Sequence, residues 1–313
     1  MVENGPRYLR LSVTGRCAMR CTYCRGSGTP AGDGRELTVE QIGLLAECAA
    51  AEGVRKVRLT GGEPLQRDDL EQVVRSVAGV GGVEEVCLTT NGVGLAERVA
   101  PLRRAGLDRV NVSLDTLRPD RFRTITGTGL HAAAVRGARA AGGVFDSVKL
   151  NAVLLRGVND DEVVPLARFG AEHSFRVRFV EYYRARNSAD GLEGVPSEEV
   201  LLRLRDAFQD LPRAPAEPLG VEEVYAVPSL GRATVGVIRS ASCPPCDRCA
   251  KLRVTASGEL LGCLFAESGA PLGPALRTGD RAGVRRAIRT VWAGKERTGP
   301  AGRRVGPVCQ IGG

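Results

Sequence analysis

Short runs of alternating hydrophobic and polar residues recur along the first part of the chain, separated by longer amphipathic stretches. Six runs have the period of two and the β-branched content of strands: residues 8–14, 54–60, 84–90, 108–114, 147–155 and 175–183. Five stretches between them have helical spacing: residues 38–53, 67–79, 95–106, 129–142 and 160–172. Strands that alternate with helices predict a parallel sheet of βα units, and six units fall short of an eight-unit barrel. The pattern therefore predicts an α/β fold in the form of a partial (βα)6-type TIM barrel, with its chemistry at the carboxyl ends of the strands.

The pattern changes towards the last third of the chain. Residues 189–196 and 211–220 predict loops on either side of an amphipathic helix at residues 197–208. Shorter β-like runs then surround a group of cysteines, at residues 221–228, 233–239 and 251–265. We therefore predict two domains: a partial barrel at residues 1–215, and a smaller metal-organised domain at residues 216–313 that ends in a Gly-Gly tail.

Composition narrows the class of protein. Hydrophobic residues make up 43% of 313 residues, which is ordinary for a globular protein. No apolar run approaches the roughly 20 residues that span a bilayer, and the first residues, MVENGPRYLRLSV, lack the pattern of a signal peptide. We therefore expect a cytoplasmic protein with no membrane partner. The net charge of +8 is compatible with nucleic acid, with a small anionic substrate, or with an arginine-rich surface.

Ten cysteines are many for a cytosolic chain, in which structural disulfides are rare. Cys48 lies in a helical pattern and Cys87 in a strand pattern, so we expect both in the core, whereas Cys309 in the tail has no assigned role. The other seven form two groups: Cys17, Cys21 and Cys24, then Cys243, Cys246, Cys249 and Cys263. This grouping indicates metal ligands.

The first group, CAMRCTYC, directly follows the first predicted strand. Three thiolates on one loop do not complete a tetrahedral zinc site, but they suit three corners of a cubane iron–sulfur cluster whose fourth iron stays open. An incomplete zinc site or redox-active thiols are the alternatives. In the second group a predicted hairpin brings Cys246, Cys249 and Cys263 together, and a zinc ribbon with Cys243 as the fourth ligand fits that spacing equally well.

These residues carry a resemblance to a known superfamily. CAMRCTYC resembles the signature of radical S-adenosylmethionine (SAM) enzymes, and TGGEP (60–64), TTNG (89–92) and VSLD (112–115) follow in order at the ends of three predicted strands. The resemblance implies a partial barrel of the radical SAM type, in which Cys17, Cys21 and Cys24 hold a [4Fe–4S] cluster. It also implies that SAM is bound by Tyr23, Gly62, Glu63, Ser113 and Tyr183.

Within that superfamily the chain resembles the GTP 3′,8-cyclase (MoaA) family of molybdenum cofactor biosynthesis from end to end. CDRCAKLRVTASGELLGC is similar to its second cluster site, and the tail QIGG to its C-terminus. The resemblance implies a second [4Fe–4S] cluster on Cys246, Cys249 and Cys263, with Arg178 and Lys251 as catalytic residues. The implied substrate-binding residues are Arg10, Arg58, Thr89, Lys149, Lys251, Leu252 and Arg253.

The resemblance also implies a reaction and its partners. A 5′-deoxyadenosyl radical removes the ribose 3′ hydrogen of GTP, and the carbon radical attacks C8, which gives (8S)-3′,8-cyclo-7,8-dihydroguanosine 5′-triphosphate. We expect a reductant of the flavodoxin or ferredoxin type, and no nucleic-acid partner. Members of the family commonly dimerise, so a homodimer belongs to the expectation.

Several residues depart from the family pattern: Gly15, Arg25, Gly26, Tyr183, Ala250 and the extra Cys243. They leave open a paralogue that acts on another nucleotide, a specialised metabolite or a peptide. Cys243 could close the second cluster as a fourth ligand, although we favour the interpretation in which it is a bystander. A metal-bearing nucleic-acid-binding module is suggested by charge alone, and GGEP beside a three-cysteine loop argues against it.

Overall fold

One sheet organises the protein. The computed structural model describes residues 5–24, 36–184, 189–217, 219–242, 246, 249–266 and 268–295. Six parallel strands form the middle of the sheet in chain order: β1 (Tyr8–Ser12), β2 (Lys56–Thr60), β3 (Glu85–Thr90), β4 (Arg109–Ser113), β5 (Val148–Leu154) and β6 (Arg176–Glu181). Each lies inside a predicted run. The sheet is open, so the prediction of an α/β partial barrel is confirmed.

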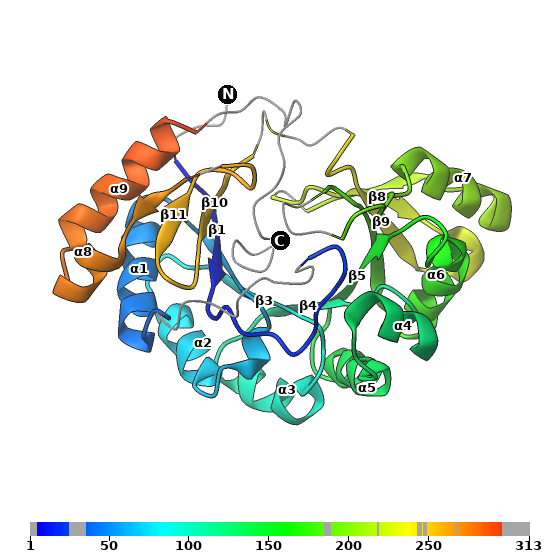
Figure 1. The fold of residues 1–313 in the computed structure, drawn as a ribbon, viewed down its shortest axis with the longest axis horizontal. Helices are drawn as coiled ribbons and strands as arrows, with labels where there is room; N and C mark the ends of the chain where they lie inside the picture. The colour runs from blue at the N-terminus through cyan, green and yellow to red at the C-terminus, as the bar shows by residue number, and fades with distance from the viewer. Residues whose placement is uncertain are drawn as a thin grey trace.

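Helices cover the outer face of these strands (Figure 1). They are α1 (Val39–Ala51), α2 (Leu70–Ala78), α3 (Leu95–Arg104), α4 (Pro119–Thr126), α5 (His131–Gly142), α6 (Val163–Glu172) and α7 (Ser197–Phe208), with short 3₁₀ turns at η1 (Pro64–Gln66), η2 (Asp160–Glu162) and η3 (Pro228–Leu230). Helix α1 begins at a capping box, in which Thr38 accepts from the Gln41 backbone and the Gln41 side chain accepts in return. Helix α4 was not predicted. In the described parts of the chain, no helix has the length and apolar character needed to cross a membrane.

The C-terminal residues extend both ends of the same sheet. Strand β10 (Lys251–Val254) pairs in parallel with β1, and β9 (Thr234–Ile238) pairs in parallel with β6. Antiparallel strands continue outwards from them: β11 (Glu259–Leu261), β12 (Ala270–Pro271), β8 (Glu223–Ala226) and β7 (Arg213–Ala214). Helices α8 (Gly273–Thr278) and α9 (Arg281–Ala293) lie beside α1 (Figure 1). The domain boundary at 215/216 stays a prediction, and the sheet itself runs across it.

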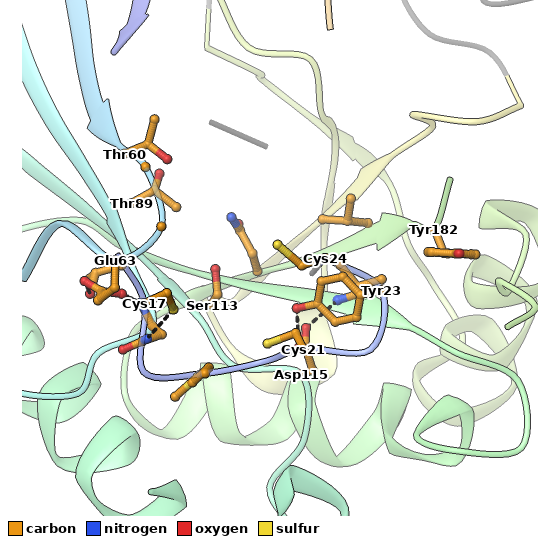
Figure 2. Close-up of a pocket in the computed structure, with 18 of the residues that line it drawn as sticks. Cys17, Cys21, Tyr23, Cys24, Thr60, Glu63, Thr89, Ser113, Asp115 and Tyr182 are labelled. Atoms are coloured by element: carbon orange, nitrogen blue, oxygen red, sulfur yellow. Dashed lines mark hydrogen bonds between the residues drawn. The ribbon is translucent and has the colours of Figure 1, made fainter. Parts of the chain in front are cut away.

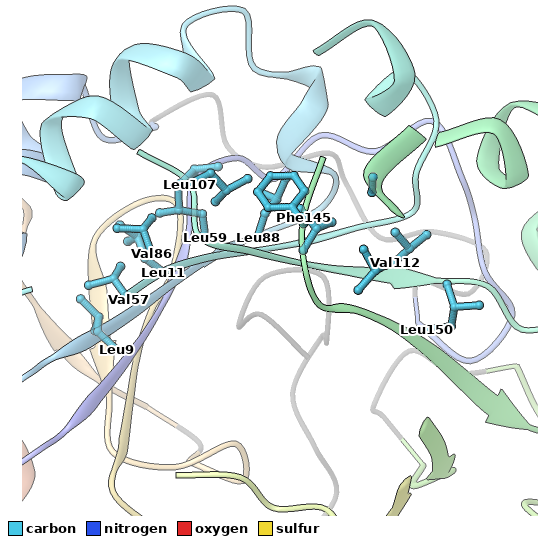
Figure 3. Packing of buried hydrophobic residues seen from close by; sticks show 14 of the residues in the cluster. Leu9, Leu11, Val57, Leu59, Val86, Leu88, Leu107, Val112, Phe145 and Leu150 are labelled. Atoms are coloured by element: carbon cyan, nitrogen blue, oxygen red, sulfur yellow. The ribbon is translucent and has the colours of Figure 1, made fainter. Parts of the chain in front are cut away.

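The alternation of side chains divides the sheet into an apolar and a polar face. Leu11, Leu59 and Leu88 point from neighbouring strands towards the covering helices and are fully buried (Figure 3). The residues next to them in sequence, such as Arg10 and Arg58, point to the opposite, inner face. Because successive strands pair in register, polar residues from many strands gather on that inner face.

The packing of the core leads to a prediction for the free energy of unfolding. Leu88→Ala removes a fully buried side chain from β3 and should lower the free energy of unfolding by about 2–5 kcal/mol. Leu202→Ala on α7, where the side chain is 57% exposed, should change it by less than about 0.5 kcal/mol. Urea unfolding followed by circular dichroism measures both, and equal effects of the two substitutions would contradict this packing.

Candidate active site

The first cysteine group lies at the carboxyl end of the sheet. Cys17, Cys21 and Cys24 line one cavity and form no disulfide. The predicted cofactor-binding residues line the same cavity: Tyr23, Gly62, Glu63, Ser113 and Tyr183. Figure 2 shows the thiols of Cys17 and Cys21 facing the ends of the central strands. The structure therefore brings together all eight residues predicted for the first cluster and SAM.

Two glycines fix the cysteine loop against the end of β2. The Gly62 backbone N–H donates to the Thr14 carbonyl at 2.8 Å, and the Glu63 N–H donates to the Arg16 carbonyl at 2.7 Å. A Cβ added to Gly62 would lie 2.1 Å from the Arg16 carbonyl oxygen, and Gly61 has a φ of +144°. Only glycine allows this approach, so the GGEP sequence positions the cysteine loop as well as the cavity wall.

Helix α4 holds the other side of the cysteine loop. The backbone N–H groups of Arg20 and Thr22 donate to the carbonyls of Thr126 and Ile125, both at 2.9 Å. Met19 packs into a small core with Phe122 and Leu114. The sequence analysis missed this helix, although Pro119 at its first turn is a recognised start signal.

Glu63 is a buried carboxylate on the cavity wall. It accepts hydrogen bonds from the Thr90 hydroxyl at 2.7 Å, the Asn91 N–H at 2.6 Å and the Leu65 N–H at 3.0 Å. Burial raises the pKa of Glu63 to about 7, although these donors favour the ionised form. A cationic ligand group beside it would stabilise the carboxylate, which fits the ammonium of an amino acid.

Asp115 and Tyr23 form a second buried pair in the cavity. The Tyr23 hydroxyl donates to Asp115 Oδ2 at 2.7 Å, and the Val153 N–H donates to Oδ1 at 2.9 Å (Figure 2). Burial raises the pKa of Asp115 to about 6. The pair fixes the tyrosine next to Cys24. Sequence analysis quoted Asp115 only as part of VSLD and did not select it as a site residue.

The donor set of the first cavity fits an iron–sulfur cluster. Among the described residues, no three Cys, His, Asp or Glu side chains converge closely enough to hold one metal ion. A cubane takes each thiolate on a different iron, so its ligands are spread apart. Three unoxidised thiols around one cavity, with a buried carboxylate opposite, fit a cluster that also binds an amino-acid group.

A second, strongly basic cavity adjoins the first. The two share Thr89, Asn151, Val180 and Tyr183 as a common wall. Eight basic residues of the described chain line the second cavity: Arg10, Lys56, Arg58, Lys149, Arg178, Lys251, Arg253 and Lys295. Cys246, Cys249 and Cys263 line it as well, so the second cysteine group faces the same space.

Strand register creates a row of guanidinium groups in this cavity. Arg10 on β1 pairs with Arg253 on β10 at one side and with Arg58 on β2 at the other. Neighbouring parallel strands are about 4.8 Å apart, which places three arginines side by side. Burial, and then repulsion from Arg253 and Arg58, lowers the pKa of Arg10 to about 10. Such a row is suited to a polyanionic ligand.

Tyr8 lies among cations at the base of the row. The Arg58 Nε donates to the Tyr8 hydroxyl at 2.5 Å, and Lys251 Nζ lies 5.5 Å from the centroid of its ring. Burial alone would raise the pKa of Tyr8, but Arg58, Arg10 and Lys251 outweigh it and lower the pKa to about 8. Burial is also the main cause that lowers the pKa of Lys251 to about 8.

The second cysteine group is held by the β10–β11 hairpin and by α9. Burial opposes ionisation of Cys249, but Lys295 and Lys251 outweigh it and lower its pKa, which favours the thiolate a metal needs. Lys295, just after α9, donates to the carbonyls of Lys251, at 2.9 Å, and Gly262. Lys295 was not among the residues predicted for the site.

Several predictions concern residues outside the described parts of the chain. They are those on Cys243, Cys309, Arg25, Gly26 and the tail QIGG.

Glu181, at the end of β6, anchors the segment that enters the second cysteine group. Its carboxylate accepts from the Ser197 N–H at 2.9 Å, the Ala241 N–H at 3.1 Å and the Ser242 N–H at 2.9 Å. The carboxylate thus fixes residues 241–242 against the central sheet. Sequence analysis also missed this contact.

One predicted substrate residue is placed apart from the others. The Leu252 side chain is 1% exposed and belongs to the core, because alternation on β10 turns it away from Lys251 and Arg253. The side chain of Leu252 therefore does not face the basic cavity, and the part of this residue in substrate binding stays a prediction. Tyr183 lies between the two cavities, with its ring 6.2 Å from the Phe265 ring at the edge-to-face angle of 60°.

Two protein-family models match successive parts of the chain. A model described as the radical SAM superfamily matches residues 11–170, and one described as Molybdenum Cofactor Synthesis C matches residues 175–300. The chain is 41% identical over 279 residues to a protein named GTP 3′,8-cyclase from Moorella thermoacetica, covering 87% of this chain and 85% of that protein. It is 38% identical over 289 residues to a protein of the same name from Geobacter sulfurreducens, with coverage of 91% and 88%.

Solved structures share the fold. Streptococcus suis SuiB bound to S-adenosylmethionine superposes with a TM-score of 0.67 at 14% identity, over 90% of this chain and 68% of that one. Native anSMEcpe with bound AdoMet gives a TM-score of 0.51 at 15% identity, over 65% and 59% of the two chains. Together with the radical SAM match over residues 11–170, this shared fold shows that the predicted partial barrel is of the radical SAM type.

Gly62→Ala tests the packing of the cysteine loop. The added Cβ meets the backbone of Arg16, so the loop must move, and iron bound by the first cysteine group should fall by at least about half, since a small displacement disrupts a preorganised site. Gly81→Ala is the control, because nothing lies within 4 Å of its added Cβ. Iron analysis after anaerobic reconstitution measures both, and full iron content in Gly62→Ala would show that the loop tolerates the shift.

Glu63→Gln tests the buried carboxylate through the pH dependence of stability. The pKa of Glu63 is about 7 in the folded protein and near its ordinary value of 4.5 in the unfolded chain. Between pH 4.5 and pH 7 the Glu63 carboxyl is therefore mostly protonated in the folded state and mostly ionised in the unfolded state. Glu63 therefore lowers the free energy of unfolding as pH rises from 4.5 to 7. The substitution should reduce the loss of stability between pH 5 and pH 7 by about 2 kcal/mol.

Urea unfolding of the ligand-free protein at several pH values measures this difference. Glu84→Gln, on a side chain that is 71% exposed, serves as the control. Parallel stability curves for wild type and Glu63→Gln would argue against a raised pKa at this position.

Proposed function

The chain belongs to the GTP 3′,8-cyclase family of the radical SAM superfamily, whose enzymes use SAM and a [4Fe–4S] cluster, and from this premise we propose that it cyclises GTP in molybdenum cofactor biosynthesis. The proposed product is (8S)-3′,8-cyclo-7,8-dihydroguanosine 5′-triphosphate. The observation that carries the proposal is the pair of adjoining cavities. One holds three thiols and a buried carboxylate, the other holds three thiols and a basic lining, and they share a wall.

In the first cavity we assign Cys17, Cys21 and Cys24 to the [4Fe–4S] cluster. When bound, the cluster and SAM supply a 5′-deoxyadenosyl radical. Glu63 is placed to pair with the SAM ammonium, and the tight Gly62 backbone gives the methionyl part a close approach. Tyr23, Ser113 and Tyr183 complete the proposed SAM site from three sides of the cavity.

In the second cavity we assign Cys246, Cys249 and Cys263 to a second [4Fe–4S] cluster. Arg10, Arg58 and Arg253 are the proposed triphosphate ligands, since their register supplies a continuous cationic row. Thr89, in the common wall, and Lys149 also line this cavity and are the other proposed substrate contacts.

Arg178 and Lys251 are the proposed catalytic residues. The Arg178 Nε donates to Asn151 Oδ1 at 2.8 Å, and Asn151 belongs to the wall that both cavities share. Lys251 lies at the other side, between Tyr8 and the second cysteine group. We infer that the two cations would enclose a nucleotide whose sugar faces the first cavity, and would thereby orient it and exclude water.

Three partners complete the proposal. GTP is the proposed substrate, a donor of the flavodoxin or ferredoxin type is the proposed reductant, and a homodimer in the cytoplasm is the proposed assembly. The support for the reductant and the homodimer is the family resemblance alone.

The experiment that tests the function is anaerobic reconstitution with SAM, reductant and GTP, followed by mass analysis of the nucleotide. The proposal requires 5′-deoxyadenosine and a cyclised isomer of GTP, which has the mass of GTP but differs from it in chromatographic retention and in its fragment masses. Cleavage of SAM without any change in GTP would instead favour the paralogue that acts on another nucleotide, metabolite or peptide.

Cysteine substitutions test the two cluster assignments separately. Wild type should bind about eight irons per chain, and replacing Cys17, Cys21 and Cys24 with Ala should remove about half of them and abolish SAM cleavage. Replacing Cys246, Cys249 and Cys263 should also remove about half, but should leave slow SAM cleavage while GTP cyclisation is lost.

Cys48→Ala is the matched control, because Cys48 is buried on α1 beside the Arg281 carbonyl, away from both cavities. It should keep the full iron content and activity. Zinc in place of iron after anaerobic reconstitution of the wild type would refute both assignments.

A further inference from the structure

Two carboxylates lie in the basic cavity. Glu222, which directly precedes β8, has a side chain that is only 1% exposed. Its Oε1 lies 3.0 Å from Lys149 Nζ and 3.1 Å from Arg176 Nη1, and its Oε2 lies 3.4 Å from Arg178 Nη1. One carboxylate therefore contacts three cations, two of which line the cavity.

Glu217 reinforces this contact from the same segment. Its Oε1 lies 2.5 Å from Lys149 Nζ and 2.8 Å from Arg109 Nη1, and its Oε2 lies 3.8 Å from Lys56 Nζ. The ammonium of Lys149 is thus held between two carboxylates. Burial opposes ionisation of Glu217, but Lys149, Lys56 and Arg109 outweigh it and lower its pKa to about 2, so its charge is present at neutral pH.

The fold makes room for this arrangement. Gly236 on β9 lies directly beneath Glu222 and Arg178: a Cβ added there would lie 3.1 Å from Glu222 Oε2 and 3.0 Å from Arg178 Cγ. A larger residue on β9 would crowd the ion pair. The buried carboxylate is therefore accommodated by the neighbouring strand.

The positions of these residues make the cavity electrically asymmetric. Glu217 and Glu222 are the carboxylates that line it within the described chain. Glu222 contacts Lys149 on β5 and Arg178 on β6, whereas Glu217 extends from Lys149 over Arg109 on β4 to Lys56 on β2. The row Arg10, Arg58 and Arg253 lies on β1, β2 and β10, so the cations that Glu222 contacts lie on strands other than those of the row. The positive charges of Lys149 and Arg178 are thus already paired with carboxylates inside the cavity.

We propose that Glu222, assisted by Glu217, is a specificity-determining residue that limits how much affinity each added phosphate brings to the site. This inference rests on the proposed nucleotide substrate. The carboxylates compete with phosphate for Lys149 and Arg178, so the triphosphate gains its contacts from the arginine row instead. Removal of the Glu222 charge frees Arg178 for phosphate, while Lys149 keeps Glu217 as its partner, and should sharpen the preference for GTP over GMP.

The experiment compares Glu222→Gln with Glu223→Gln in the anaerobically reconstituted protein. Glu223 is the adjacent residue, but it pairs with Arg213 and Arg239 and does not line the cavity. Equilibrium dialysis gives the dissociation constants of GTP and GMP. Glu222→Gln should bind GTP about tenfold more tightly, as one gained charge-assisted contact allows, and GMP no more than about threefold more tightly. Glu223→Gln should match the wild type for both.

Two further measurements keep the inference falsifiable. Glu217→Gln should shift GTP affinity in the same direction, which covers the case in which Glu222→Gln fails to fold. Unchanged or weaker GTP binding in both variants, or an equal gain for GTP and GMP, would overturn the inference. Inorganic tripolyphosphate is the third ligand: if wild type shows no affinity for GTP, the proposed function fails, while tighter tripolyphosphate binding by Glu222→Gln would still support the role of Glu222.

Discussion

The in-register pairing of parallel strands is the constraint on which the rest of the structure depends. Because side chains alternate along a strand and neighbouring strands are not offset, one set of positions forms the core and the adjacent set forms the cavity. Leu9 and Leu11 lie under the helices, while Tyr8 and Arg10 line the basic cavity. A shift of one residue in β1 would turn Arg10 into the core and Leu9 and Leu11 into the cavity.

Much of the fold follows from sequence because its signals are local. The runs of the six central strands alternate hydrophobic and polar residues and contain β-branched residues. Thr38 and Gln41 form a recognisable capping box at the start of helix α1. Helix α4 has eight residues and no side-chain N-cap, so it is weak alone and depends on its contacts with the cysteine loop. Helix α9 was missed for a related reason: its arginines find partners on or just after α1, as Arg285 does with Glu52 at 2.6 Å.

The candidate site likewise contains residues that can be predicted from the sequence and residues that cannot. Cysteines, GGEP and the paired basic residues of β1, β2 and β10 are recognisable because each motif is contiguous in the chain. Their supporting acids are not, since Glu222 lies 73 positions from Lys149 and Asp115 lies 92 positions from Tyr23. A single sequence shows a buried acid as just another charged residue. Leu252 shows the converse limit, because its place in a motif says nothing of which face of β10 its side chain takes, and its part in substrate binding stays a prediction.

The attachment of β9 and β10 to opposite ends of the central sheet has a consequence for the order of folding. Strands β1 and β6 are made early in synthesis, yet their outer partners come from residues 234–238 and 251–254. Until those residues emerge, the nascent chain exposes two unpaired strand edges, each a template for pairing with another chain. The C-terminal residues thus protect the barrel against aggregation as well as building its basic cavity. A chain that stops at residue 215 would retain the first cysteine group but leave both edges open.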